Sequence, residues 1–441
     1  MIIAMIMSFY INARLASIYL VAVILLGTCL FLIMRSATKY FEQAFPKYDE
    51  LNASVQENVS AIRVVKAYVR EDYETGKFHK ASENIYKIFC KAEENLSFNA
   101  PLMQLTVYSC ILLISWLGAK MIVGSSLSTG ELMSLLTYCM NILMSLMMLS
   151  MVFVMITMSL ASARRISEVL NEKSDLDNPE NPDFSIPDGS ITFDHVYFNY
   201  KKGAGEPVLS DINLSIQSGE TIGIIGGTGS AKTSLVNLIS RLYDVTDGSI
   251  KVGGKDVRSY DMETLRNEVA VVLQKNVLFS GTILDNLRWG DKNASEEECK
   301  RVCRLACADE FIDRMPDGYN TYIEQGGSNV SGGQKQRLCI ARALLKKPKV
   351  LILDDSTSAV DTATDAKIRK AFLTEIPETT KLIIAQRISS VQDADRIIVM
   401  ENGKVNGFGS HEELLKTNEI YREVYESQTG GDGDFDEKRG E

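Results

Sequence analysis

ETIGIIGGTGSAKTSLVNLI, residues 220–239, is the stretch that decides the fold of the second half of this chain. It has the pattern of a short apolar strand, a glycine-rich turn and the beginning of a helix. Gly226, Gly227 and Gly229 allow the backbone N–H groups of the turn to curl around phosphate groups. The helix N-terminus that follows adds a partial positive charge. The stretch therefore predicts a loop that binds the phosphates of a nucleotide.

The end of this turn predicts how the phosphates are held. Lys232 would reach the β- and γ-phosphates, and the Thr233 hydroxyl would ligate Mg²⁺. The strict pattern G-x-x-x-x-G-K-[ST] fails at one position, because Ala231 replaces the last glycine. Alanine keeps the backbone N–H and fits a helix start, so we expect ATP binding to survive. The candidate ATP-binding residues of the loop are Gly226, Gly227, Thr228, Gly229, Ser230, Ala231, Lys232, Thr233 and Ser234.

Four other segments carry candidate site residues. VSGGQKQR, residues 330–337, is a second glycine-rich turn that opens a helix, where the alternative is an ordinary helix cap. The buried strand that ends at Asp354 supplies an acid for Mg²⁺, and Gln274 ends the strand VAVVLQ with an amide that could hold a metal-bound water. Tyr200, in YFNY before the first expected strand of the cassette, could stack on adenine; taken alone, such a tyrosine is more often a packing residue.

The order and spacing of these segments resemble the ATP-binding cassette (ABC) exporters over essentially the whole chain. By this resemblance Tyr200 belongs to the adenine-stacking loop, residues 226–233 to the Walker A loop and Gln274 to the Q-loop. Asp354 is similar to the Walker B acid and Asp361 to the D-loop acid. The residues that match the family's signature are Ser331, Gly332, Gly333 and Gln334. In such exporters two cassettes meet head to tail, and each ATP lies between one Walker A loop and the other chain's signature.

Two positions depart from the family's pattern. The family's catalytic base is a Glu directly after the Walker B acid, and Asp355 stands there. Aspartate is one methylene shorter, which withdraws the carboxylate from the attacking water by roughly 1–1.5 Å, and displacements of this order can cost about a hundredfold in rate. The family also has a His that contacts the γ-phosphate, and Gln386 occupies that position. We expect Asp355, Gln386 and Gln274 to be the residues at the hydrolytic centre.

An intact signature beside altered hydrolytic positions has a specific implication. This chain's own site should bind ATP with Mg²⁺ and hydrolyse it weakly, whereas its signature can complete a competent site on another chain. The resemblance therefore implies a heterodimer with a second ABC half-transporter. One alternative is that Asp355 and Gln386 work adequately. Another, from a different functional class, is an ATP-gated regulatory or channel subunit that uses nucleotide binding without pumping.

The first part of the chain predicts membrane helices. Residues 15–34, 96–119 and 132–163 are uncharged stretches of 20, 24 and 32 residues, and about 20 apolar residues suffice to cross a bilayer. Buried helices of a soluble core are the alternative, but such helices are shorter and carry a polar face. Residues 1–13 are apolar and too short to cross, and we interpret them as the outer end of a span whose beginning is missing.

Charge asymmetry predicts the orientation of these spans. Residues 35–91 contain ten Lys and Arg, whereas residues 120–131 contain one, which places the first segment in the cytoplasm and the second outside. The nucleotide motifs are then cytoplasmic. Within the charged helical extension, residues 60–71 (SAIRVVKAYVRE) are amphipathic and similar to a coupling helix. The net charge of −10 and the acidic C-terminal stretch argue against nucleic acid as a partner.

The predicted organisation is an all-α transmembrane domain over residues 1–170, with the helical extension at residues 35–95, followed by an α/β P-loop cassette over residues 191–428. Three of the chain's nine prolines fall in residues 171–190, which predicts a linker. Beyond it strands and helices alternate, as in a mostly parallel sheet. Residues 429–441 are expected to be an acidic, flexible tail.

Evidence about the substrate is limited to one stripe of methionines. At steps of three and four along the last span lie Met140, Met144, Met147, Met151, Met155 and Met158. Thioethers suit a surface that accepts varied hydrophobic ligands, although packing in the core or contact with lipid is the favoured interpretation. Ionisable residues are lacking in the three spans, so a proton relay has no candidate there. We expect export of hydrophobic or amphipathic compounds across the lipid bilayer, with the plasma membrane of a prokaryote favoured.

Overall fold

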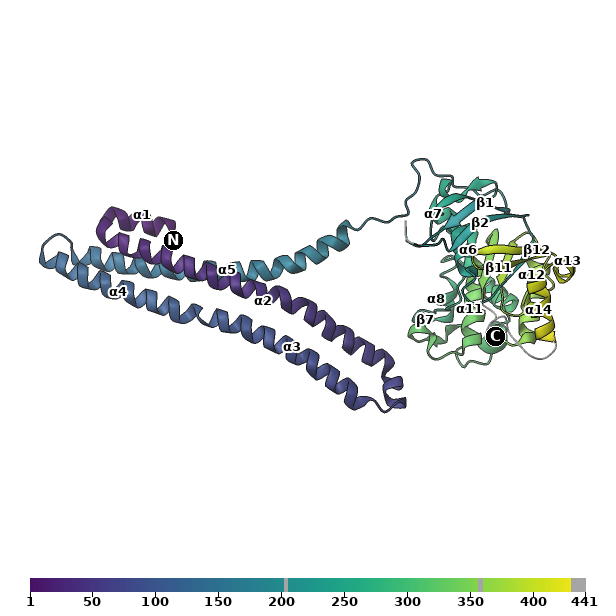
Figure 1. Ribbon diagram of the computed structural model, residues 1–441, viewed down its shortest axis with the longest axis horizontal. Helices are drawn as coiled ribbons and strands as arrows, with labels where there is room; N and C mark the ends of the chain where they lie inside the picture. Colours follow the sequence, from purple (N-terminus) through teal and green to yellow (C-terminus); the bar gives the residue numbers. More distant parts are fainter. Residues whose placement is uncertain (202–204, 356–359, 430–441) are drawn as a thin grey trace. The chain divides into compact units, whose positions relative to one another are not determined.

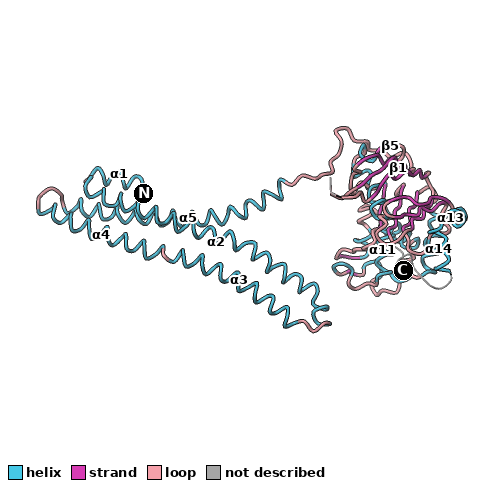
Figure 2. The backbone as a smooth tube through the Cα atoms, in the orientation of Figure 1, coloured by secondary structure: helices cyan, strands magenta, loops and turns pink. Residues whose placement is uncertain are grey.

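The computed structural model describes residues 1–201, 205–355 and 360–429, and the chain divides into two compact units. Unit 1 is Met1–Lys173 and unit 2 is Ser174–Glu441. Figure 2 shows that unit 1 contains helices and loops only, whereas the strands belong to unit 2. The predicted fold class, a helical transmembrane domain followed by an α/β cassette, is confirmed.

Unit 1 is built from long helices that lie side by side (Figure 1). They are α1 (Ile2–Ile11), α2 (Ala13–Ala67), α3 (Glu71–Ser97), α4 (Asn99–Val123) and α5 (Thr129–Asn171). Three helical segments of the described chain are long and apolar enough to cross a membrane, namely Ala13–Ala67, Glu71–Val123 and Thr129–Phe153. The predicted span 15–34 lies within α2, 96–119 lies mostly in α4, and 132–163 lies within α5. In lipid the helix satisfies its own backbone polar groups, and apolar side chains suit the hydrocarbon around it.

Asn12 separates the short apolar helix α1 from α2. Its extended backbone (φ −156°, ψ 106°) breaks the helix, and its side-chain oxygen accepts hydrogen bonds from the N–H groups of Arg14 and Leu15, both at 3.1 Å. This cap satisfies two N–H groups that the start of α2 would otherwise leave unpaired. As a result α1 folds back and contacts α2 and α5.

The core of unit 1 differs from the expectation for the methionine stripe. The buried residues of α5 are Leu135, Cys139, Ile142, Leu143 and Leu146. The five methionines of the stripe with described side chains are exposed by 40 to 71%, and the side chain of Met158 lies outside the described part. These five therefore lie outside this chain's own core, and contact with lipid, the other part of the favoured interpretation, stays a prediction. A helix can be apolar on every face, so its pattern did not reveal which face the neighbouring helices cover.

Residues 60–71, expected to form a coupling helix, are the end of one helix and the turn into the next. The backbone of α2 departs from helical geometry at Ala61 (φ −105°, ψ 17°) and α2 ends at Ala67. The turn contains Val69 at φ 53°, and α3 begins at Glu71. The apolar side chains of Ile62 and Val69 are 48 and 81% exposed. This apolar surface is consistent with a docking role, which stays a prediction.

Unit 2 contains three sheets. The six-stranded sheet has the order β12-β11-β3-β10-β9-β6 and is parallel except for β12. Its strands are β3 (Thr221–Ile225), β6 (Val269–Val272), β9 (Val350–Asp354), β10 (Thr380–Ile384), β11 (Arg396–Glu401) and β12 (Lys404–Gly409). An antiparallel sheet contains β1 (Ile191–Phe198), β2 (Leu209–Ile216), β4 (Asp247–Val252) and β5 (Lys255–Asp256), and a small one contains β7 (Gly281–Thr282) and β8 (Tyr322–Ile323).

Both faces of the six-stranded sheet are buried. Leu351 and Leu353 of β9 pack in a core with the helices that follow β6, whereas Val350 and Ile352 of the same strand pack in a second core with β1, β2 and β4. This is why β9 is a continuous apolar run rather than an alternating one. The helices of unit 2 are α6 (Lys232–Ile239), α7 (Met262–Glu268), α8 (Ile283–Leu287), α9 (Glu296–Leu305), α10 (Asp309–Ile312), α11 (Gly332–Leu345), α12 (Thr362–Glu375), α13 (His411–Thr417) and α14 (Glu419–Thr429).

The second half of the expected linker packs on unit 2. The Asn178 amide donates to the Asp261 carboxylate at 2.6 Å, and Ile186 is 1% exposed within the second core. The Lys349 ammonium also donates to the Ile186 carbonyl. Prolines prevented these residues from forming a helix or an inner strand, but they did not prevent packing.

Candidate functional site

The fold brings four predicted motifs to one edge of the six-stranded sheet. The glycine-rich loop follows β3, Gln386 follows β10, Asp354 ends β9 and Asp355 follows it, and Gln274 follows β6. These four strands are parallel neighbours in the order β3-β10-β9-β6, so their carboxyl ends meet at the same edge. In open α/β sheets ligands bind at this edge.

The loop between β3 and α6 has the backbone that its glycines predict. Gly226 lies at φ 152°, and a Cβ there would collide with the Met400 carbonyl oxygen and the Ser230 hydroxyl. Gly229 lies at φ 82° in open space. Only glycine adopts such angles readily, so these two positions shape a loop whose inside is lined by backbone.

Ala231 has an unexpected conformation. It is the N-cap of α6 with φ 71° and ψ 23°, in the left-handed region. The residue stands at a helix start, as expected, but its backbone is strained there, because the Cβ of an L-residue approaches the following carbonyl in this conformation at a cost of roughly 1–2 kcal/mol. The family's glycine would adopt the same angles without that strain.

The change Ala231→Gly should therefore stabilise the cassette, by about 0.5–1 kcal/mol after the greater freedom of glycine in the unfolded chain is subtracted. Thermal unfolding of the purified chain would measure it as a higher midpoint. The control is Ala371→Gly inside α12, where the backbone is helical and the same change should lower stability by roughly 0.5–1 kcal/mol. A lower midpoint for both variants would contradict the assigned strain.

Lys232 and Thr233 point to the two sides of the loop. The Lys232 ammonium donates to the carbonyl oxygens of Gly226 and Gly227 at 2.7 and 2.9 Å. The Thr233 hydroxyl donates to the Asp354 carboxylate at 2.9 Å. Burial raises the pKa of Asp354, which is 2% exposed; the Thr233 hydrogen bond opposes this shift and the neighbouring Asp355 adds to it.

These donors fit Mg²⁺ next to nucleotide phosphates. A hydroxyl oxygen and a buried carboxylate in direct contact are hard oxygen ligands of the kind Mg²⁺ prefers, and Mg²⁺ usually takes its other ligands from water and phosphate. A cation would also relieve the repulsion between the carboxylates of Asp354 and Asp355. Thr233 and Asp354 would hold the ion, which would supply charge neutralisation for the phosphates, and the Gln274 amide contacts the Asp355 carboxylate at 3.4 Å.

The three residues expected at the hydrolytic centre are brought together. The Gln386 amide donates to one carboxylate oxygen of Asp355 at 3.0 Å, and the Gln274 amide donates to the same oxygen at 3.4 Å. Asp355 lies at φ 48°, and its N–H donates to the Ile384 carbonyl of β10 at 3.1 Å. The Asp355 carboxylate is thus held between two neutral amides.

Tyr200 lies beside the start of α6. It follows β1, rather than preceding the first strand as expected, because the YF of YFNY belongs to that strand. Its hydroxyl lies 2.9 Å from the Ser234 hydroxyl, and its ring packs edge-on against Phe198 and Tyr243 with centroids 4.8 and 5.0 Å apart. The ring is half exposed, so it fits a base-stacking platform next to the phosphate loop.

The predicted signature forms the N-terminus of α11. Ser331 caps this helix, since its hydroxyl accepts from the Gln334 N–H at 3.3 Å while the Gln334 side chain accepts from the Ser331 N–H at 2.9 Å. Ser331 and Gly332 are exposed and Gly333 is partly so. Asp361 caps α12 by accepting from the Thr364 N–H at 2.9 Å. Residues 356–359, between Asp355 and this cap, lie outside the described part.

Two residues at this site had no signal in the sequence. Tyr243 supports the ring of Tyr200 from the turn after α6, and Gln428 on α14 contacts the backbone of Gln386. Neither lies in a recognisable motif, and Gln428 is 42 residues from its partner. Only the tertiary fold places them here.

Comparisons with known proteins agree with this geometry. Residues 209–358 match the family model of the ABC transporter, and residues 1–147 match that of the ABC transporter transmembrane region. The uncharacterized ABC transporter ATP-binding protein YfiB of Bacillus subtilis is 38% identical over 97% of this chain and 74% of its own length. The ATP-dependent lipid A-core flippase of Desulfotalea psychrophila is 36% identical over 95% of this chain and 73% of its own length.

A solved structure extends the likeness to three dimensions. A bacterial Atm1-family ABC exporter with ATP bound superimposes with a TM-score of 0.89 and 27% identity, over 97% of this chain and 76% of that chain. The chain spans about three quarters of the length of these relatives. Family models and relatives both cover the membrane helices as well as the cassette. The protein therefore belongs to the ABC transporters, as a membrane half-transporter of the exporter type that joins a transmembrane region to an ATP-binding cassette.

Proposed function

We propose that the chain is the ATP-binding and permease subunit of a heterodimeric exporter, and that its own ATP site binds the nucleotide but hydrolyses it weakly. The observation that carries this proposal is the contact between Asp355 and Gln386. The position of the family's catalytic glutamate holds a shorter carboxylate, and the position of the family's histidine holds an uncharged amide that donates to it at 3.0 Å.

The chain's histidines do not compensate for Gln386. The ring of His195 lies 2.7 Å from the Asp211 carboxylate on the antiparallel sheet, and that of His411 lies 2.6 Å from the Tyr421 hydroxyl on α14. His79 lies on α3 of unit 1. A glutamine can donate a hydrogen bond to a γ-phosphate but cannot become a cation. The charge that a protonated histidine would bring to the transferring phosphoryl group is therefore missing.

The signature supports the second half of the proposal. Ser331 and Gln334 cap α11 with a complete reciprocal pair of hydrogen bonds, and the exposed turn of glycines leaves backbone N–H groups open to an anion. In the head-to-tail pairing of this family, that turn serves the ATP bound by the other chain. If the partner half-transporter has an intact glutamate and histidine, the ATP site on the partner, completed by this chain's signature, would be the competent site of the pair.

The cargo and the orientation belong to the same proposal. The exposed methionine stripe of α5 offers flexible, polarizable side chains to a neighbouring surface, and one relative is named as a lipid A-core flippase. We therefore assign hydrophobic or amphipathic compounds, lipid-like ones included, as the cargo. We place the cassette on the cytoplasmic side of a prokaryotic plasma membrane, because residues 35–91 contain ten Lys and Arg whereas residues 120–131 contain one.

Directional transport is the experiment that tests this function. The chain would be purified with its partner half-transporter, reconstituted into liposomes, and supplied with ATP outside. A fluorescent phospholipid should change leaflet in an ATP-dependent way, with no movement when a non-hydrolysable ATP analogue replaces ATP. If ATP and the analogue instead open an ion conductance equally and no lipid moves, the chain acts as a gated subunit and the export proposal is wrong.

A further inference from the structure

The loop that carries Gln386 is held from two sides by residues far away in the sequence. This switch loop, residues 386–391, connects the end of β10 to the segment before β11 and includes a short 3-10 turn at Ile388–Ser390. Its position decides whether the Gln386 amide reaches the Asp355 carboxylate. What fixes the loop therefore also fixes a residue that we place next to the γ-phosphate.

The C-terminal helix α14 binds the backbone of this loop through one side chain. The Gln428 side-chain oxygen accepts from the Ile388 N–H at 2.8 Å, and its amide nitrogen donates to the Gln386 carbonyl at 3.0 Å. The two backbone groups flank Arg387, so a single planar amide, with its acceptor and its donor, pairs with both. Gln428 therefore pairs with a backbone N–H and a backbone carbonyl at the Gln386 end of the loop, as the backbone of a neighbouring strand would.

Helix α14 is itself firmly anchored. Tyr421 is fully buried, and its hydroxyl lies 2.6 Å from the ring nitrogen of His411 on α13. At the start of α14, Asn418 donates to the side-chain oxygen of Asn406 at 2.7 Å and accepts from the Tyr421 N–H at 2.9 Å. Gln428 thus projects from a helix whose first turn is fixed by these contacts.

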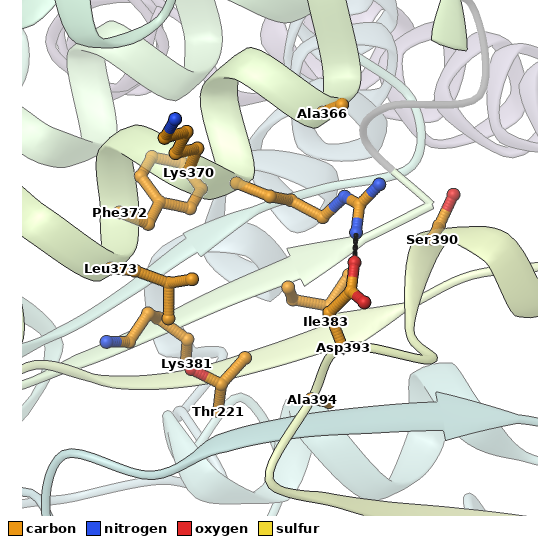
Figure 3. Close-up of a pocket in the computed structure, with 11 residues that line it drawn as sticks. Thr221, Ala366, Lys370, Phe372, Leu373, Lys381, Ile383, Ser390, Asp393 and Ala394 are labelled. Atoms are coloured by element: carbon orange, nitrogen blue, oxygen red, sulfur yellow. Dashed lines mark hydrogen bonds and ion pairs between the residues drawn. The ribbon is translucent and has the colours of Figure 1, made fainter. Parts of the chain in front are cut away.

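The other end of the loop is held by different contacts. The Ser390 hydroxyl donates to Asp365 of α12 at 3.3 Å, and Arg369 joins Asp365 to Asp393 with bonds of 3.2 and 3.1 Å. Ser390 and Asp393 line a pocket of about 260 Å³ (Figure 3), and Arg369 also lines it. Ile388 and Val391, 2 and 1% exposed, pack in the first core of unit 2 and fix this end of the loop. Gln386 and Arg387 are exposed, so the Gln428 clamp is the restraint on the Gln386 end.

We propose that Gln428 is a positioning residue that sets the Gln386 amide at the γ-phosphate position, which makes the C-terminal helix part of the ATP-sensing machinery. This inference rests on the proposed function of Gln386. It predicts a loss of discrimination between nucleotides. When the clamp is lost, the exposed Gln386 end of the loop can withdraw, and ATP loses a contact that ADP never makes.

The test is equilibrium binding of ATP and ADP to the full-length purified chain with Mg²⁺ at low temperature. Gln428→Ala should weaken ATP binding by roughly 3- to 10-fold, as expected for the loss of one hydrogen bond, and leave ADP binding unchanged. Gln428→Glu has the same shape and should lower the ratio at least as much, since it places a carboxylate against the Gln386 carbonyl. The control Glu426→Ala, at an exposed position of the same helix, should leave the ratio unchanged.

A double-mutant cycle separates positioning from mere stability. In a Gln386→Ala background, Gln428→Ala should not change the ATP-to-ADP ratio further, because the residue it positions is gone. An unchanged ratio in both Gln428 variants, or an equal change with and without Gln386, would overturn the inference. Lys232→Ala distinguishes a failure of the Gln428 clamp from a failure of the ATP-site assignment. If it binds both nucleotides normally, the site assignment has failed; if it binds neither while the Gln428 variants stay silent, only the clamp is wrong.

Discussion

Replacing Lys232 by alanine is expected to abolish binding of ATP, with a loss of affinity of about 100-fold or more. The Lys232 ammonium is held at the centre of the phosphate loop by the carbonyl oxygens of Gly226 and Gly227. A cation there is the loop's own counter-charge to the β- and γ-phosphates. Hydrogen bonds between charged groups contribute roughly 1.5–3 kcal/mol each, and more than one is lost.

Retention of a fluorescent ATP analogue by the purified chain measures this loss. The matched control is Lys251→Ala, which removes a partly exposed lysine from β4 of the same unit and should retain the analogue like the unchanged chain. Equal retention by Lys232→Ala and Lys251→Ala would show that the loop after β3 is not the nucleotide site.

The second large effect concerns the signature of this chain. Ser331→Ala combined with Gly332→Glu should reduce ATP turnover of the assembled pair by about 100-fold or more. The change removes hydrogen-bond donors to the phosphoryl group of the ATP bound by the partner, and the partner's site is the competent one. The double change removes the cap of α11 and places a carboxylate at its N-terminus, where an anion is meant to bind. Steady-state ATPase activity of the purified heterodimer measures it.

Loss of a helix cap away from the signature is the control for a loss of stability alone. Ser295 caps α9 with the same reciprocal arrangement, paired with Glu298, so Ser295→Ala should cost about 1 kcal/mol of stability and little turnover. Asp355→Asn should lower ATP turnover much less than the double change in the signature. A working general base raises the rate of hydrolysis by about 10²–10⁴-fold, whereas the Asp355 carboxylate should contribute little to the measured rate. Asp355→Glu alone should not create a second competent site, because Gln386 remains.

The sequence predicted the parts of the site that depend on local geometry and chain order. The glycines at 226 and 229, the apolar run that ends at Asp354 and the capped turn at Ser331 each specify their own backbone, and parallel strands then bring them to one edge. The conformation of Ala231 was not predictable in this way. Alanine favours a right-handed helix, and the loop forces it into the left-handed region against that preference.

Other features of the structure depend on contacts between residues that are far apart in the sequence. The methionines of α5 with described side chains are exposed because α1, α2 and α4 pack on other faces of that helix. Residues 178–190 looked like a linker from their prolines, but Ile186 finds a place in the core of unit 2. Gln428 bonds to a loop 40 and 42 residues away, so its contacts follow from the packing of α14 rather than from any local pattern.

ATP bound by this chain's own loop is expected to stay intact while its partner's ATP is hydrolysed. Photo-crosslinking with 8-azido-ATP tests it most directly, because the adenine is captured by the chain whose Tyr200 platform holds it. The heterodimer would be incubated under turnover conditions with analogue carrying radioactive phosphorus in the α- or γ-position, irradiated, and the two chains separated. The ratio of γ- to α-label on this chain should stay near that of unhydrolysed analogue, while the ratio on the partner falls towards zero. A ratio on this chain that falls as fast as the partner's would contradict the claim, since Asp355 and Gln386 would then support hydrolysis.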